Sequence, residues 1–192
     1  MNRSGTQIDE HRICMKDIKQ YLTEGFKLNK NYKNPYNYHP KDKKELKDIV
    51  KKLIDELGFD ADLNDIDMSE IIDMSQLFYS SEFNGDISNW DVSNVENMCN
   101  MFYNSEFDGD LSQWDVGNVR DMYGMFYGSK FSGENGSLEN WDVSSVIHMQ
   151  FMFSHSEFNG DLSKWNVRNG VYMDDMFWHS PLEGHEPEWY GK

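Results

Sequence analysis

The chain has 192 residues, a formal net charge of -16 and 15% aromatic residues. This length fits one domain with at most a small appendage, and so acidic a chain repels nucleic acid and anionic membranes. The apolar runs are too short to cross a bilayer, so the sequence predicts neither a nucleic-acid-binding nor a membrane-spanning protein.

The charge is divided between two regions. Residues 1–58 hold 13 Lys and Arg against 9 Asp and Glu, whereas residues 59–192 hold 5 against 25. Such asymmetry indicates two regions with different surfaces. We therefore expect an N-terminal helical cap over residues 1–58, a repeat region over 59–182, and a C-terminal tail or cap over 183–192.

Two helices are predicted in the N-terminal cap. Residues 40–57 place apolar side chains from Leu46 onward at helical spacing, with Pro40 suited to the first turn and Gly58 to a C-terminal stop. A weaker apolar stripe predicts a second helix over residues 13–26. Because the end of a stack of repeats exposes its core, we expect this helical pair to cover it.

A repeat of about 24 residues follows the cap. Its tryptophans are separated by 24, 27 and 24 residues: Trp90, Trp114, Trp141 and Trp165. Each follows a phrase of the kind Phe-Asn-Gly-Asp-Ile-Ser-x-Trp, and each unit continues to a Met-x-x-Met-Phe ending. Three extra residues within 132–137 account for the spacing of 27. A half-unit at residues 62–73 precedes about four such units.

This period predicts the fold. A repeat near 24 residues is typical of leucine-rich repeats, in which each unit makes one strand and one return segment. We interpret residues 87–92 as the strand and residues 98–102 as a helical or 3₁₀ return. Eight residues of that unit should point inward: Phe83, Ile87, Trp90, Val92, Val95, Met98, Met101 and Phe102. The sequence thus predicts an α/β repeat, a short leucine-rich-repeat-like solenoid with parallel strands and an N-terminal helical cap.

The repeat phrases resemble those of the BspA-like leucine-rich-repeat surface proteins of host-associated bacteria, whose repeat also occurs in Mycoplasma lipoproteins. The lead-in at residues 63–74 and the ending at 180–190 match the same arrays. The resemblance implies the leucine-rich-repeat fold, a role in adhesion or protein interaction, and display at the cell surface. The polar N-terminus lacks a signal-peptide core, so the protein is expected in the cytoplasm if Met1 is the natural start.

No catalytic or metal centre is expected. The Asp residues recur once per unit, which the repeat explains better than an active site does. A column such as Asp86, Asp110 and Asp161 offers oxygen ligands for Ca²⁺, but we expect each Asp to accept a backbone N–H at its own turn. Cys14 and Cys99 show neither metal nor disulfide spacing. The sequence therefore predicts no enzyme, no cofactor and no metal.

One candidate partner-binding site lies in the last units, where polar columns of the repeat become apolar: Ile147, His148, Phe151, Val171 and Tyr172. An exposed apolar patch often marks a partner surface. The alternative is that these residues pack against the C-terminal tail, whose Trp189 and Tyr190 need cover.

A second candidate is a column of aromatic residues that Ser154 interrupts: Tyr79, Tyr103, Tyr127 and Trp178. Tyr rings are good contact residues with little entropy to lose on binding. Packing between units is the favoured alternative for this column. His155 and His179 share a neighbouring column, where a solvated pair is expected in preference to a metal site.

These observations favour a non-enzymatic, adhesin-like scaffold, expected to be monomeric, that binds a partner protein through one face of the repeat. The alternative is an acidic inhibitor or nucleic-acid mimic that occupies the nucleic-acid site of a defence or restriction enzyme. Regular carboxylates suit such a mimic, although units stacked about 4.8 Å apart are spaced more closely than phosphates along a strand.

Overall fold

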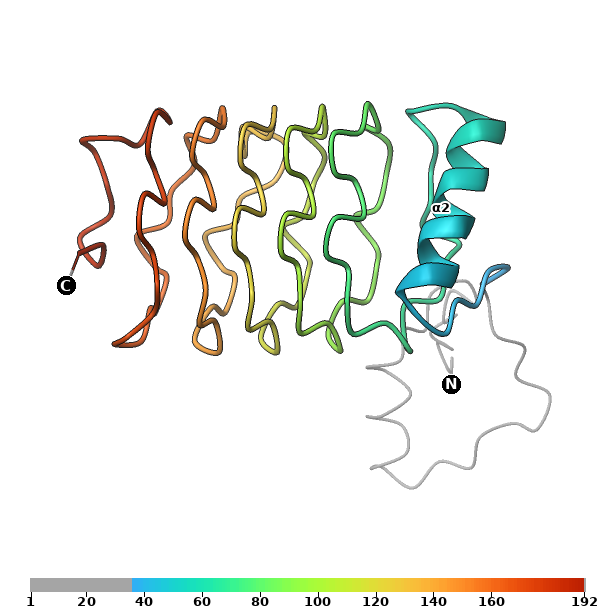
Figure 1. Ribbon diagram of the computed structural model, residues 1–192, viewed down its shortest axis with the longest axis horizontal. Coiled ribbons are helices and arrows are strands. Elements are labelled where there is room, and N and C mark those ends of the chain that lie inside the picture. Colours follow the sequence, from blue (N-terminus) through green and yellow to red (C-terminus); the bar gives the residue numbers. More distant parts are fainter. Residues whose placement is uncertain (1–35, 192) are drawn as a thin grey trace, which may run out of the picture.

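The computed structural model describes residues 36–191, and α2 (Lys43–Leu57) is the one helix among them. After α2 the chain winds through coils that stack in a single row, with α2 along the first coil and the C-terminal residues at the far end (Figure 1). The predicted helix over residues 13–26 lies outside the described residues, so the cap of residues 1–58 is seen only in its second half.

The helix predicted over residues 40–57 is confirmed, with a start three residues later. Asp42 caps it, since its carboxylate accepts the amide of Glu45 at 2.9 Å. Gly58 ends it with a φ of 96° and donates its amide to the Ile54 carbonyl at 2.9 Å. The side chains that α2 buries are Leu46, Val50 and Leu53. The helix thus covers the apolar end of the first coil.

The predicted parallel strands do not form, and the α/β solenoid predicted from the sequence is wrong. Among the described residues no sheet is present, and α2 is followed by turns and bends. Pairing between segments is limited to six isolated parallel bridges: Tyr38–Ile66, Asp62–Asp86, Asp73–Asn97, Asn97–Asp121, Asp121–His148 and His148–Tyr172.

Residues 87–92 turn too often to be a strand. The side chains of Asp86 and Asp91 each accept the backbone N–H two residues further on, at 2.9 and 3.1 Å. Between them the amide of Trp90 donates to the Ile87 carbonyl at 3.2 Å. Three turns within eight residues prevent consecutive residues from staying extended. The apolar side chains that suggested a strand are therefore held by turns.

The return segments are not helical either. In residues 98–104 every second backbone amide donates to a carbonyl of the next coil, at 2.7–2.9 Å. Amides between them close turns within the segment; for example, the Met101 amide donates to the Met98 carbonyl at 3.2 Å. Asn100 and Asn104 have φ values of 53° and 50°, and these left-handed residues bend the segment away from a helix. We call residues 74–81, 98–105, 122–129, 149–156 and 173–180 the return segments.

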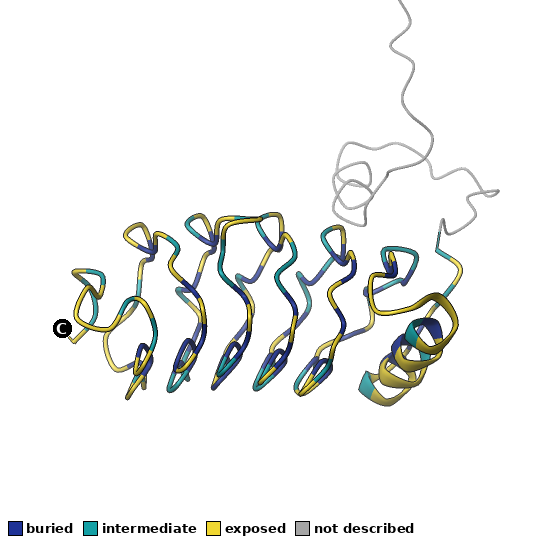
Figure 2. Ribbon diagram, turned by 90° about the horizontal axis from the view of Figure 1, so that it is seen from above, coloured by how far each residue is buried: buried dark blue, intermediate teal, exposed yellow. Residues whose placement is uncertain are grey.

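A continuous core runs through the stack (Figure 2). All eight residues predicted to point inward are buried: Phe83, Ile87, Trp90, Val92, Val95, Met98, Met101 and Phe102. One Phe from each return segment stacks on the next, with ring centroids 5.4–5.9 Å apart. The predicted half-unit is a whole coil, because the carbonyls of both Phe59 and Ser81 accept amides from the next coil.

A tryptophan joins each coil to the one before it. The indole N–H donates to a carbonyl of the preceding coil at 2.8–3.1 Å, in the pairs Trp90–Leu63, Trp114–Ile87, Trp141–Leu111, Trp165–Leu138 and Trp189–Leu162. The tail therefore supplies the tryptophan of a further coil, and Tyr190 packs edge-on against Phe177 at 5.1 Å. Trp189 and Tyr190 cover the end of the core.

The turn carboxylates make the stability depend on pH. Hydrogen bonds from Ser144 hold the pKa of Asp142 below its ordinary value. Burial raises the pKa of Asp73, but hydrogen bonds from Ser75 and the charge of Lys43 outweigh burial and lower it. A carboxyl group with a lowered folded-state pKa stabilises the fold above its unfolded pKa, and this stabilisation is lost as pH falls through the folded value.

We therefore expect the free energy of unfolding in urea to change little between about pH 7 and 5 and to decrease below about pH 4, where unfolded Asp begins to bind protons. High salt should be present throughout, because it screens the general repulsion between acidic groups. Under those conditions, a free energy of unfolding that rises on acidification would contradict a stabilising role of the turn carboxylates.

Candidate interaction surface

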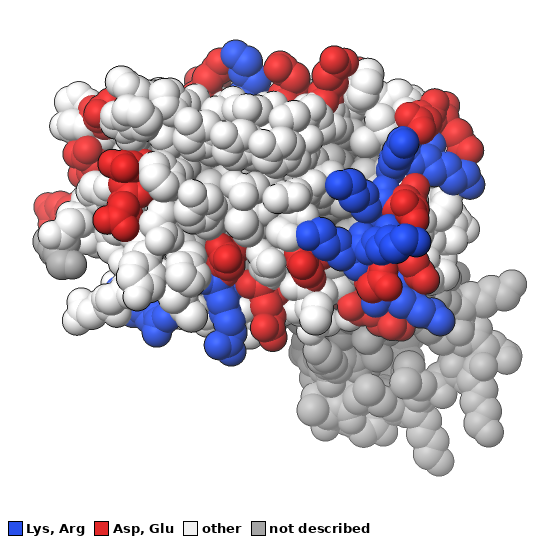
Figure 3. All heavy atoms as spheres, viewed as in Figure 1, with Lys and Arg blue, Asp and Glu red and all other residues white. Residues whose placement is uncertain are grey.

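Four return segments carry no charge. Residues 74–81, 98–105, 122–129 and 149–156 contain no Asp, Glu, Lys or Arg, although the formal net charge is -16. Figure 3 shows a broad uncharged area on the coils, with charged side chains along its margins. The acidic residues of these coils lie in the phrases on both sides of each tryptophan, where residues such as Asp86 and Asp91 form turns. One face of an acidic protein is therefore left neutral.

A ladder of tyrosines runs along this face. Tyr79 and Tyr103 stack with ring centroids 4.8 Å apart, and Tyr103 and Tyr127 with centroids 4.6 Å apart, at interplanar angles of 3° and 7°. Tyr79 is 47% exposed, and the other two are half-buried. Burial, with the neighbouring hydroxyls, raises the pKa of Tyr103. Since each ring covers the face of its neighbour, the ladder presents ring edges and hydroxyl groups.

The ladder continues past Ser154 through a neighbouring residue. Ser154 is buried, and His155 takes its place, with its ring centroid 5.3 Å from Tyr127 and 4.8 Å from Trp178. His155 has a φ of 57°, close to the values of Ser80 and Asn104 at the same position in other coils, so the coil geometry is kept. Its ring also lies 4.9 Å from His179. The sequence analysis placed His155 and His179 together in a column beside the ladder, and their rings are in contact. It missed the contacts of His155 with Tyr127 and Trp178.

The candidate patch in the last units is brought together only in part. His148 and Tyr172 stack with centroids 5.3 Å apart at 9°, and Tyr172 is 55% exposed. Phe151 is half-buried and contacts Tyr123 edge-on at 5.7 Å, a residue that the sequence interpretation missed. Ile147 is half-buried. Val171 is only 8% exposed and belongs to the core, so placing it on an exposed patch was wrong.

Nine residues on or beside the return segments form what we call the aromatic face: Tyr79, Tyr103, Tyr123, Tyr127, His148, Phe151, His155, Tyr172 and Trp178. The C-terminal tail leaves this face open, because the rings of Trp189 and Tyr190 contact Trp165 and Phe177. The patch therefore does not serve to cover the tail.

Phe151 is a bulky residue at a position that is left-handed in every coil. Its φ is 59°, and the equivalent residues Gln76, Asn100, Gly124 and Asp175 have φ values of 53–58°. Asn and Gly tolerate this geometry better than Phe does. A bulky residue held in this region costs about 1 kcal/mol or more. Its ring contacts the ring of Tyr123 edge-on, and the side chain is only half-buried. Such a residue is more readily explained by binding than by folding.

Phe151→Asn should therefore change the free energy of unfolding by less than about 1 kcal/mol, since relief of the left-handed geometry offsets the lost apolar contact. Binding of a partner through this face should weaken about tenfold. Urea unfolding and a binding titration measure the two effects. A loss of several kcal/mol in stability with binding unchanged would show that Phe151 is a packing residue.

Residues 36–191 were compared with the requirements of a metal site, a membrane-spanning helix and a reactive thiol. No group of three or more His, Cys, Asp or Glu side chains in this part of the chain could hold a metal ion. No described helix is long and apolar enough to cross a membrane. Burial raises the pKa of the Cys99 thiol, which favours its protonated, less reactive form. Cys14 lies outside the described residues.

The Asp columns act as turn formers, as expected. Asp86, Asp110 and Asp161 each accept the backbone N–H of the serine two residues on, at 2.8–2.9 Å. Asn97 does the same at 2.9 Å, so the turn requires an oxygen acceptor and not a charge.

A comparison with known protein families identifies the family of this chain. Residues 44–137 and 129–184 match the family described as Mycoplasma protein of unknown function, DUF285. The two matches cover more than half of the chain, so the chain belongs to this family. No curated protein and no solved structure matches it.

Proposed function

We propose that this protein is a non-enzymatic scaffold that binds another protein through the aromatic face. The observation that carries the proposal is the set of uncharged return segments, which expose aromatic rings on a chain of net charge -16. Solubility alone favours charged residues at exposed positions. Tyr and Trp are enriched at protein interfaces, because they offer a large contact area and a polar tip at small entropic cost.

The geometry of the ladder favours a protein ligand over a small planar one. Tyr79, Tyr103 and Tyr127 are stacked on one another, so their inner ring faces are already covered. A base or sugar that binds by stacking needs an open ring face. Ring edges and hydroxyl groups are suited instead to the backbone and side chains of a protein surface.

The resemblance of the repeat to a class of surface proteins favours a role in adhesion. The repeat phrases resemble those of BspA-like surface proteins, and this resemblance favours a partner met at the cell surface, with this chain binding as a monomer. The alternative, mimicry of nucleic acid, receives less support, because Asp86, Asp110 and Asp161 are each hydrogen bonded to their own turns. A mimic would hold its carboxylates free for a cationic site.

Affinity capture with matched variants tests the proposal. The full chain and two variants are immobilised and exposed to extracts of the host and of the source cells. One variant carries Tyr79→Ser, Tyr103→Ser and Tyr127→Ser. The other carries Asp110→Asn and Asp161→Asn, which keep the oxygen that accepts the turn N–H.

A protein captured by the native chain and by the Asn variant, and reduced about tenfold with the Ser variant, supports binding through the aromatic face. Capture that survives the Ser substitutions and is lost with the Asn substitutions would show that the acidic surface binds.

A further inference from the structure

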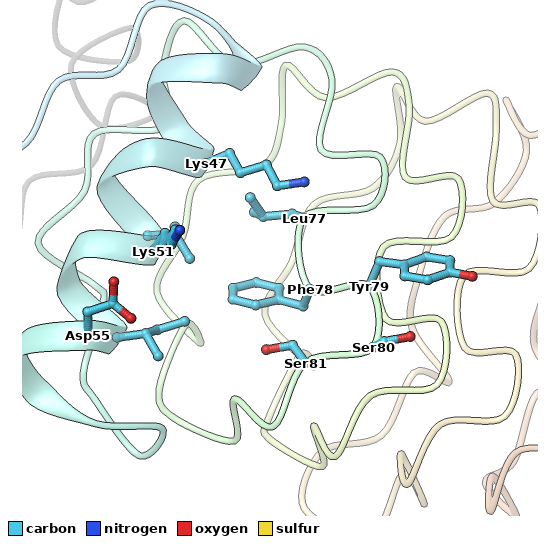
Figure 4. A pocket seen from close by; sticks show the side chains of 10 residues that line it. Lys47, Lys51, Asp55, Leu77, Phe78, Tyr79, Ser80 and Ser81 are labelled. Carbon is cyan, nitrogen blue, oxygen red and sulfur yellow. The ribbon is translucent and has the colours of Figure 1, made fainter.

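A pocket of about 280 Å³ lies between α2 and the first return segment, at the end of the aromatic face that begins with Tyr79 (Figure 4). Its floor is apolar and consists of Val50, Ile54, Leu77 and Phe78. Ser80, Ser81, Lys47 and Lys51 also line the pocket. Lys47 extends from α2 toward Leu77 of the first return segment (Figure 4). The pocket therefore combines an apolar floor with cationic and hydroxyl groups.

The backbone beside this pocket presents two carbonyl groups to which no residue of 36–191 donates. In the next coil, the Met101 carbonyl accepts from Phe78 at 2.9 Å and the Tyr103 carbonyl from Ser80 at 2.7 Å. The three coils after it repeat both bonds at 2.7–2.9 Å. In the first coil the equivalent carbonyls belong to Leu77 and Tyr79, and no described residue donates to either. They point where a preceding coil would lie, toward α2.

These two carbonyls form an open edge of the stack. In each later coil, two acceptors separated by one residue pair with two amides that are separated in the same way, and the backbone of a peptide can supply such a pair of amides. Extended peptides bind proteins by completing such edges. Within the stack, the residue between the two donors is Tyr79, and it lies on the ring of Tyr103. In an added segment the equivalent side chain would lie on the outer ring face of Tyr79, which no described ring covers.

The charge at the pocket indicates what else the segment carries. Lys47 and Lys51 form no ion pair with another described residue, whereas Lys44 pairs with Asp48 at 3.6 Å and Lys52 with Glu56 at 3.9 Å. Asp55 lies at the opposite end of the pocket from Lys47 (Figure 4). Two ammonium groups without an ion pair among residues 36–191 favour a carboxylate ligand on this acidic protein.

We propose that this pocket binds an acidic, extended peptide segment of the partner protein. The inference rests on the proposed function, because the pocket extends the aromatic face. Two amides of the segment donate to the carbonyls of Leu77 and Tyr79, and the side chain between them lies on the Tyr79 ring. A neighbouring carboxylate lies between the ammonium groups of Lys47 and Lys51.

Titration of the full, ¹⁵N-labelled chain with synthetic capped octapeptides tests the inference. The probe alternates glutamate with tyrosine. One control peptide has lysine in place of glutamate, and another is N-methylated at alternate amides. We expect saturable shifts at residues 77–81 and in α2 with the glutamate probe, binding about tenfold weaker for the lysine peptide, and binding about fivefold weaker for the N-methylated one.

Two charge-matched variants sharpen the test. Lys47→Glu with Lys51→Glu should weaken binding of the glutamate probe about tenfold, and Lys44→Glu with Lys52→Glu should not change it, since those lysines are already paired. Equal binding of all three peptides, or equal effects of both variants, would overturn the inference. So would a carbodiimide crosslink from Lys47 or Lys51 to a carboxylate of residues 1–35, because the chain would then occupy its own pocket.

Different results would contradict the peptide site and the proposed function. If the partner captured through Tyr79, Tyr103 and Tyr127 binds equally well to the Lys47→Glu and Lys51→Glu variant, the peptide site is wrong and the aromatic face stands. If the Ser substitutions do not affect capture, the proposed function is wrong.

Discussion

Trp114→Ala is expected to lower the free energy of unfolding by about 3–5 kcal/mol. Trp114 is 3% exposed, and its ring stacks on Trp90 with centroids 6.4 Å apart. Its indole N–H donates to the Ile87 carbonyl at 3.1 Å. The substitution therefore opens a cavity in the middle of the stack and leaves a carbonyl without its donor. Urea unfolding followed by circular dichroism measures the change.

Trp114→Phe serves as the control, because it keeps an aromatic ring and removes only the outer ring and the donor. Its cost should be smaller, about 1–3 kcal/mol, mostly from the unpaired carbonyl of Ile87. If the Ala variant loses less than about 1 kcal/mol, the tryptophans do not join the coils, and the account of the core is wrong.

Gly85→Ala is expected to cost about 3 kcal/mol, through steric conflict with the neighbouring coil. A Cβ atom at residue 85 would lie 2.0 Å from the carbonyl oxygen of Ala61 and 2.7 Å from the ring of Phe83. That oxygen accepts the Asp86 amide at 3.0 Å, so it cannot move without breaking a bond between coils. Thermal and urea unfolding both report the loss.

Gly170→Ala is the matched control. Residue 170 has a φ of 82° but no atom within 4 Å of an added Cβ, so the substitution should cost only about 1 kcal/mol of backbone strain. If Gly85→Ala is no more destabilising than Gly170→Ala, the coils are not packed as closely as described.

The core could be predicted from the sequence because the repeat fixes which positions are apolar. Phe83, Trp90 and Met98 recur at one spacing and are all buried. The absence of strands could not be predicted, because turns and strands can both place apolar residues at such spacings. What decides between them is local: the Asp86 and Asp91 side chains, which fold the backbone into turns, and the left-handed φ values of Asn100 and Asn104.

The candidate surface was predicted only in part, because the repeat spacing shows which residues are neighbours on adjacent coils but not which of them are buried. The Tyr79, Tyr103 and Tyr127 column was visible as a spacing, and stacking in the structure confirms that they are neighbours. Val171 was misplaced because Gly170 occupies the position where other coils have a buried valine. Gly170 cannot fill the core, so the chain turns with a φ of 82° and Val171 is buried instead. Repeat alignment alone does not show such a shift.

Site-specific photo-crosslinking tests the aromatic face most directly. A benzophenone side chain is placed at Tyr127, at Tyr172, or at exposed Gln113, which lies in the Asp-rich phrase between Asp110 and Asp115. Irradiation with the captured partner should give a crosslinked product from Tyr127 and from Tyr172, and none from Gln113. Crosslinking from Gln113 alone would contradict binding through the aromatic face and place the partner on the acidic phrases.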